Sequence, residues 1–184
     1  MASIEIHSVQ SVSGNQPRVR RMAEKAGQTF LPGTPIFVDA TGFLIAVVSP
    51  ATTAVPLAGF SKEQAANLAA SGVAQQQTFG SVPNQAAAVN IARPFFNDGN
   101  TGFEVATQDT VFLGQVGPAQ TALITDIGTT VGLTKDADNH WFLDKTAAGV
   151  NKVATITKLD PNDQAAVPRG VYFVLIPAAF QALL

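Results

Sequence analysis

Apolar and polar residues follow strand-like patterns along most of the chain. Residues 4–9 alternate between the two classes, as expected of a short β-strand. Residues 26–48 contain two apolar runs around a turn, where Gly42 can take the positive φ that tight turns often require. From Phe95 onward, apolar runs recur at short intervals with Gly, Pro or Asn between them. This spacing favours an antiparallel barrel or sandwich.

The last third of the chain has the clearest pattern. Two β-prone runs, residues 129–134 and 141–145, flank the polar residues 135–140, which predicts a hairpin. Residues 153–159 alternate, and residues 170–176 are nearly all apolar, as in a strand buried on both faces. Between these two runs, Asp160-Pro-Asn-Asp163 has the residues of a turn with proline at its second position.

The middle of the chain has a different character. Ser61 and Gln64 have the spacing of a capping box, which predicts a helix over residues 62–70 ending near Gly72. A second helix is predicted over residues 85–92, with Asn84 as its N-cap. The fold class expected is therefore mainly β, with small antiparallel barrel or sandwich modules and one or two short helices in a central excursion.

Four segments follow from these patterns. We expect an N-terminal arm over residues 1–25, a small β-module over 26–60, a helical and loop excursion over 61–94, and a C-terminal barrel or sandwich domain over 95–184. The excursion is either an insertion that reaches a neighbouring molecule or a plain linker between the modules.

Particular motifs in two parts of the chain resemble the head decoration (cement) proteins of tailed bacteriophages. In the carboxy-terminal part they are Val131-Gly-Leu, an acidic turn, Trp141-Phe-Leu-Asp, Val153-x-Thr-Ile-x-x-Leu-Asp-Pro-x-Asp and Arg169-Gly-Val-Tyr-Phe-Val. In the amino-terminal part they are Ala26-Gly-Gln-Thr-Phe, Gly33-Thr-Pro-Ile-Phe-Val-Asp, Gly42 and Ala58-Gly-Phe. Residues 61–96 show no such likeness.

The resemblance implies a structural virion protein, made in the cytoplasm of a host bacterium. Such a protein sits on the outside of the assembled capsid and locks its subunits together. The implied partner is the major capsid protein, and self-association as a dimer or trimer on the capsid is expected.

Composition is compatible with an interface role. Charged residues make up 13% of the chain, against roughly 25% in an ordinary soluble domain. A charge-poor polar surface is easily desolvated, and the cores of protein interfaces are likewise depleted of charge. A β-rich chain with many turns offers an equally good explanation. The net charge of −2 gives no general attraction to nucleic acid, and no apolar run is long enough to span a membrane.

No catalytic residue set is present, so we predict that the protein is not an enzyme and needs no cofactor. Cysteine is absent, and His7 and His140 are the only histidines. The sequence Asp136-x-Asp-x-His140 is similar to the start of a calcium loop, but Trp141 and Ala147 replace the glycine and glutamate that such a loop needs. We therefore expect turn chemistry there, not a metal site.

Seven residues are candidates for contact with the capsid. The basic residues of the arm suit acidic patches on a capsid subunit, although a solvated loop would also carry such residues. An exposed aromatic pair would mark a second contact, and the single tryptophan is either a core anchor or a binding hot spot. The candidates are Arg18, Arg20, Arg21, Lys25, Phe95, Phe96 and Trp141. Removal of residues 1–25 is expected to weaken attachment and to leave the β-fold intact.

Two other functions stay open at this point. The protein could be another virion part, such as a head-fibre base or a tail connector, which its low copy number would reveal. A carbohydrate-binding sandwich is the third interpretation. It would depend on exposed aromatic rings such as that of Trp141.

Overall fold

The computed structural model describes residues 5–14, 16–25, 27–65 and 100–181. These residues form a mainly β structure, which confirms the predicted fold class. Helical structure in them is limited to three-residue 3₁₀ turns: η2 (Ile124–Asp126), η3 (Gly149–Asn151) and η4 (Pro177–Ala179). None of the described helices is long and apolar enough to cross a bilayer.

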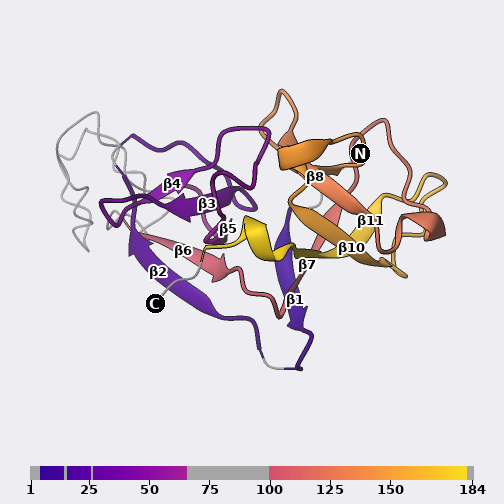
Figure 1. Ribbon diagram of the computed structural model, residues 1–184, viewed down its shortest axis with the longest axis horizontal. Coiled ribbons are helices and arrows are strands. Elements are labelled where there is room, and N and C mark those ends of the chain that lie inside the picture. Colours follow the sequence, from indigo (N-terminus) through magenta and orange to yellow (C-terminus); the bar gives the residue numbers. More distant parts are fainter. Residues whose placement is uncertain (1–4, 15, 26, 66–99, 182–184) are drawn as a thin grey trace, which may run out of the picture.

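Two antiparallel sheets lie side by side (Figure 1). The five-stranded sheet has the order β2-β6-β5-β3-β4 and the six-stranded sheet the order β1-β7-β11-β10-β8-β9. The strands are β1 (His7–Ser11), β2 (Val19–Ala23), β3 (Pro35–Val38), β4 (Leu44–Ala46), β5 (Gly59–Ser61), β6 (Asn100–Val105), β7 (Thr110–Gln115), β8 (Thr130–Lys135), β9 (Trp141–Asp144), β10 (Ala154–Leu159) and β11 (Gly170–Leu175).

Both sheets curl without closing. In the five-stranded sheet, a single parallel bridge between Glu24 and Leu44 brings the end of β2 back to β4. In the six-stranded sheet, a bridge between Val116 and Leu143 brings the end of β7 to β9. One bridge is not a ladder, so the barrel form of the prediction is wrong and the sheets are open.

The chain contains the same five-stranded arrangement twice. If the strands of the first unit, β2 to β6, are numbered one to five in chain order, their order in the sheet is 1-5-4-2-3. Strands β7 to β11, numbered in the same way, also give 1-5-4-2-3. Strand β1 is an addition to the second unit, next to β7.

The turns between the second and third strands of the two units have the same pattern of backbone hydrogen bonds. Asp39 N–H donates to Phe43 O over 2.9 Å, and Asp136 N–H donates to His140 O over 3.1 Å. Each aspartate Oδ1 also accepts the N–H groups two and four residues later. The fourth position has positive φ in both turns, 88° at Gly42 and 65° at Asn139. The predicted roles of Gly42 and of the Asp/Asn turn are confirmed.

One apolar core is shared by both units. It joins Phe60 of β5 to Phe112 and Phe173 of β7 and β11, and all three rings are fully buried. A smaller cluster, which includes Ile36 and Phe103, fills the first unit alone. Buried apolar surface therefore holds the two sheets together.

The predicted segment boundaries need correction. Strands β1 and β2 belong to the six- and five-stranded sheets respectively, so the described residues of the predicted arm, 5–14 and 16–25, are part of the β structure and not a separate arm. Strand β6 pairs with β2 and β5, which places residues 100–105 in the first unit and not in a C-terminal domain. Sequence periodicity detects strands but does not show which sheet receives them.

The capping-box prediction is also wrong for residues 61–65, the part of it that the structure describes. Ser61 ends β5 and is buried, its hydroxyl donates to Leu31 O, and its Oγ accepts Thr34 N–H. Residues 62–65 contain bends and no helix. The rest of the predicted first helix and the whole second helix lie outside the described residues.

Candidate binding surface

The basic residues predicted to contact a partner lie along one sheet edge. Strand β2 is the outer strand of the five-stranded sheet, with β6 as its neighbour in the sheet order. Arg18, Arg20, Arg21 and Lys25 are exposed on this strand or beside it. The structure therefore brings together all four basic candidates, on a strand and not on a loose arm.

Arg21 has a role within the fold. Its guanidinium donates to both carboxylate oxygens of Glu63 over 3.1 and 3.2 Å, and to Asn100 O over 3.0 Å. Glu63 in turn accepts the N–H of Gly102. These contacts tie β2 to the connection that leaves β5, so Arg21 is less available to a partner than the sequence suggests.

Lys25 is also paired within the chain. Its ammonium lies 3.0 Å from a carboxylate oxygen of Asp39. The Thr41 hydroxyl, the Phe43 N–H and then Lys25 hold the pKa of Asp39 well below its usual range. This aspartate caps the β3–β4 turn, so Lys25 contributes to a turn and not only to the surface.

Arg18 and Arg20 are also exposed at this edge. No described residue bonds to the guanidinium of Arg18, while its backbone O accepts the N–H of Val105. Of the aromatic candidates, Phe95 and Phe96 lie outside the described residues. Trp141 is only 5% exposed and packs in the shared core. This burial agrees with the core interpretation of Trp141 and argues against a direct contact with a partner.

Comparisons with protein-family models, curated proteins and solved structures found no match.

A small cavity of about 250 Å³ lies between the two units. The segment before β3 forms one wall, and the β8–β9 hairpin contributes Lys135, Asn139 and Trp141. The Lys135 ammonium already donates to Asn139 Oδ1 over 2.8 Å. Among the described residues, the one charged side chain that lines the cavity is therefore already paired.

The acidic turn at Asp136, Asp138 and His140 has ligand atoms within 4.8 Å of one another. However, Asp136 Oδ1 accepts two backbone N–H groups, from Asp138 and His140, each over 2.9 Å. Asp136 Oδ2 lies 3.5 Å from His140 Nδ1. The same backbone bonds occur at Asp39, which has no such cluster, so the fold of the turn explains them.

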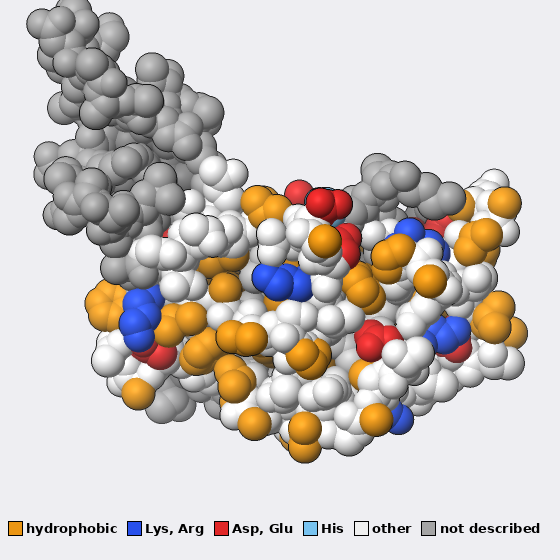
Figure 2. Space-filling view, turned by 90° about the horizontal axis from the view of Figure 1, so that it is seen from above, with side chains coloured by type: hydrophobic (Ala, Val, Ile, Leu, Met, Phe, Trp, Pro, Cys, Tyr) orange, Lys and Arg blue, Asp and Glu red, His pale blue; other side chains and the backbone are white. Residues whose placement is uncertain are grey.

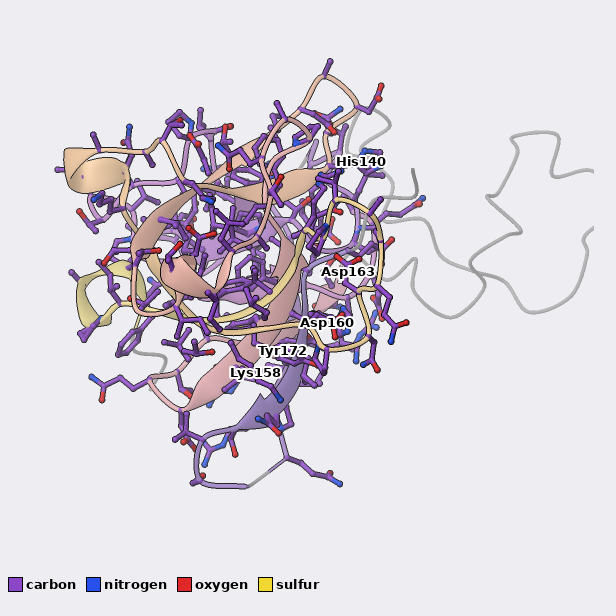
Figure 3. All side chains as sticks on the ribbon, turned by 90° about the vertical axis from the view of Figure 1, so that its right-hand side faces the viewer. His140, Lys158, Asp160, Asp163 and Tyr172 are labelled. Carbon is purple, nitrogen blue, oxygen red and sulfur yellow. The ribbon has the colours of Figure 1, made fainter. Side chains whose placement is uncertain are left out.

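Charged side chains lie along β10 and in the β10–β11 connection. Figure 3 shows Lys158 and Tyr172 on neighbouring strands, where the ammonium lies 5.7 Å from the ring centre. In the connection itself, Asp163 Oδ2 accepts the N–H groups of Arg169 and Gly170, each over 2.6 Å. The predicted turn is present, because Asp163 N–H donates to Asp160 O.

An apolar patch around η2 was missed by the sequence analysis. Leu123, Ile124 and Ile127 are 51%, 72% and 41% exposed. The loop is held in shape by Asp126, whose Oδ2 accepts the Leu123 N–H over 2.8 Å and lies 2.7 Å from Lys145 Nζ. The sequence signals this patch only by its apolar residues, which a buried segment would also have. Exposed apolar side chains on a fixed loop are suited to contact with another protein.

Charged side chains are sparse on the face seen in Figure 2, where uncharged polar and apolar atoms predominate. This agrees with the charged fraction of 13% for the whole chain. Desolvation of such a surface costs less than desolvation of a charge-rich one.

Proposed function

We propose that the chain is a structural virion protein that binds the outer surface of an assembled tailed-phage capsid and stabilises contacts between its major capsid subunits. The observation that carries this proposal is the resemblance to head decoration proteins. Its carboxy-terminal motifs lie in β8, β9, β10 and β11, four successive neighbours in one sheet. The resemblance therefore follows one contiguous piece of the fold.

The architecture suits a cement role. A core shared by two units makes the molecule one stiff body, which can contact two neighbouring subunits at once. When many copies attach to one shell, modest individual contacts add up, because the shell cannot expand without breaking many of them.

The apolar patch formed by Leu123, Ile124 and Ile127 is the best candidate for the capsid-facing surface. It combines exposed apolar area with a loop fixed by Asp126 and Lys145. Burial of such side chains on binding releases about 25 cal/mol per Å² of apolar surface. The exposed Arg18 and Arg20 at β2 are further candidates for contact with the capsid.

Burial of Trp141 weighs against a carbohydrate-binding function. That interpretation needed an exposed aromatic platform, and the ring of the single tryptophan is in the core. A head-fibre base or tail connector stays distinguishable by its copy number.

Sedimentation with capsids tests the proposal. The purified chain is mixed with assembled shells from which it has been stripped, and separately with unassembled capsid protein. We expect it to sediment with the shells and to show little affinity for free subunits. The double variant Leu123→Ser/Ile124→Ser should bind more weakly, while Val150→Ser, exposed on another loop, serves as the matched control. Equal binding to free subunits, or no binding to shells, would contradict the proposal.

A further inference from the structure

The repeated topology shows that the two units differ at one edge. In the second unit, the outer edge of the first strand, β7, is covered by β1, which pairs with it antiparallel from His7↔Leu113 to Ser11↔Thr110. In the first unit, the corresponding strand is β2, and it stands at the edge of its sheet.

The two strands can be aligned through a glycine in each unit. Lys62 N–H donates to Gly102 O over 2.9 Å, and Asp160 N–H donates to Gly170 O over 3.0 Å, so the two glycines are equivalent. Gly102 pairs with Arg21 and Gly170 pairs with Gln115. Arg21 of β2 is therefore equivalent to Gln115 of β7. Two residues earlier in each strand, Val19 is equivalent to Leu113, which pairs with His7 of β1.

The backbone of Val19 points to the open edge. Val105 N–H donates to Arg18 O, so Arg18 belongs to a hydrogen-bonded pair with β6. Since such pairs alternate along antiparallel strands, the N–H and C=O of Val19 point away from β6. No described residue bonds to these two groups, and the Val19 residue is 55% exposed.

We propose that the edge of β2 around Val19 is a strand-addition site that accepts an extended acidic segment of a partner protein. The added segment would pair with β2 in the way that β1 pairs with β7, and its backbone hydrogen bonds would provide the affinity. Arg18 and Arg20 flank Val19 and are exposed, so carboxylates on the added segment are favoured there. The inference does not depend on the proposed function.

Charge argues against two other occupants. A second copy of the chain, paired through its own β2, would place arginines opposite arginines, which destabilises a cross-strand pair. Residues 66–97 of this chain include no Asp or Glu and cannot supply the carboxylates.

A pair of variants at Val19 tests the site. Val19→Pro removes the N–H that points outward and leaves every N–H that bonds to β6. An edge strand tolerates proline at such a position. Val19→Ala retains the N–H and is the matched control. The probe is a capped peptide of about six alternating Glu and Val residues, the usual length of a strand, and its counterpart has Lys in place of Glu. Binding to the full chain is measured by calorimetry and by NMR shifts of backbone amides, and Trp141 fluorescence verifies that each variant is folded.

We expect the acidic peptide to bind the wild type and Val19→Ala alike, and to shift the Val19 amide. Val19→Pro should lower its affinity about three- to tenfold, the effect of one lost hydrogen bond. Arg18→Gln/Arg20→Gln should lower it as well, and the basic peptide should not bind. No binding of the acidic peptide, equal binding of both peptides, or an unchanged affinity in Val19→Pro would overturn the proposal. Self-association of the chain that Val19→Pro abolishes would assign the edge to a second copy and would also overturn it.

Discussion

The ring of Phe60 lies 4.7 Å, centroid to centroid, from the ring of Phe112, at an interplanar angle of 59°. Phe60 belongs to β5 of the first unit and Phe112 to β7 of the second. Phe173 completes the cluster, with its ring 5.6 Å from that of Phe112. Tilted aromatic contacts of this kind add about 0.5–1.5 kcal/mol to the burial of the rings themselves. The two units are therefore expected to unfold together.

Phe60→Ala tests this cooperativity. The substitution should lower the free energy of unfolding by about 3–5 kcal/mol, because it leaves a cavity in a fully buried site. Trp141 lies in the other sheet and reports on it by fluorescence during urea unfolding. We expect the fluorescence midpoint to shift together with the circular dichroism signal. An unmoved Trp141 transition would show that the units unfold independently, and Val48→Ala, at a site 83% exposed, should leave both signals unchanged.

Ile6→Ala tests whether the amino-terminal segment is part of the fold. Ile6 is 2% exposed and belongs to the shared core, so its truncation should cost about 2–5 kcal/mol. Val9, in β1, is 40% exposed, and Val9→Ala should cost about 0.5 kcal/mol or less. Chemical unfolding of the two variants measures the difference. Equal, small effects would restore the idea of a loosely attached arm.

The matching turns predict that asparagine is tolerated better than alanine in place of Gly42. Its φ is 88°, and no atom lies within 4 Å of the point where a Cβ would sit, so strain comes from the backbone alone. Gly42→Ala should cost about 1–2 kcal/mol. Gly42→Asn should cost less, because Asn tolerates this conformation and occupies the equivalent position as Asn139. Thermal unfolding of both variants gives the comparison, and an Asn variant as unstable as the Ala variant would argue against the equivalence.

Acid should weaken the fold partly through Asp163. The N–H groups of Arg169 and then Gly170 lower the pKa of this carboxyl below the ordinary value of 3.8. The folded chain therefore binds fewer protons than the unfolded chain as the pH approaches that value. The stabilisation is complete above pH 3.8 and is lost as the pH falls through the lower folded pKa.

Asp163→Asn should accordingly be less stable at neutral pH and should lose less stability on acidification. Urea unfolding from neutral pH to about pH 2 measures both effects. Asp138→Asn is the control, because its carboxylate accepts no hydrogen bond from a described residue. A pH dependence of Asp163→Asn as steep as that of the wild type would contradict the assignment.

The sequence predicted strands well where periodicity and turn residues agreed. The hairpin at residues 135–140 is an example, because Asp136 and Asn139 determine the turn locally. Ser61 shows the opposite case. Its spacing to Gln64 fits a helix cap, but pairing of β5 with β3 and β6 uses the residue in a strand, and such long-range pairing leaves no local signal.

The candidate surface was predicted in part. The arginines were identified by their charge, but the contact of Arg21 with Glu63 depends on residues distant in sequence. Burial of Trp141 and the repeated strand order likewise depend on sheet topology, which the hydrophobic pattern does not encode. The patch at Ile124 was missed because an exposed apolar run and a buried one look alike in sequence.

The central claim, a cement role on the capsid, is tested most directly by the copy number of this chain relative to the major capsid protein in purified particles. A ratio of about one, or a simple fraction such as about one third, is the predicted result, because a lattice-wide role fills every equivalent position. A handful of copies per particle would place the protein at a vertex, fibre or tail, and its absence from particles would contradict a virion role altogether.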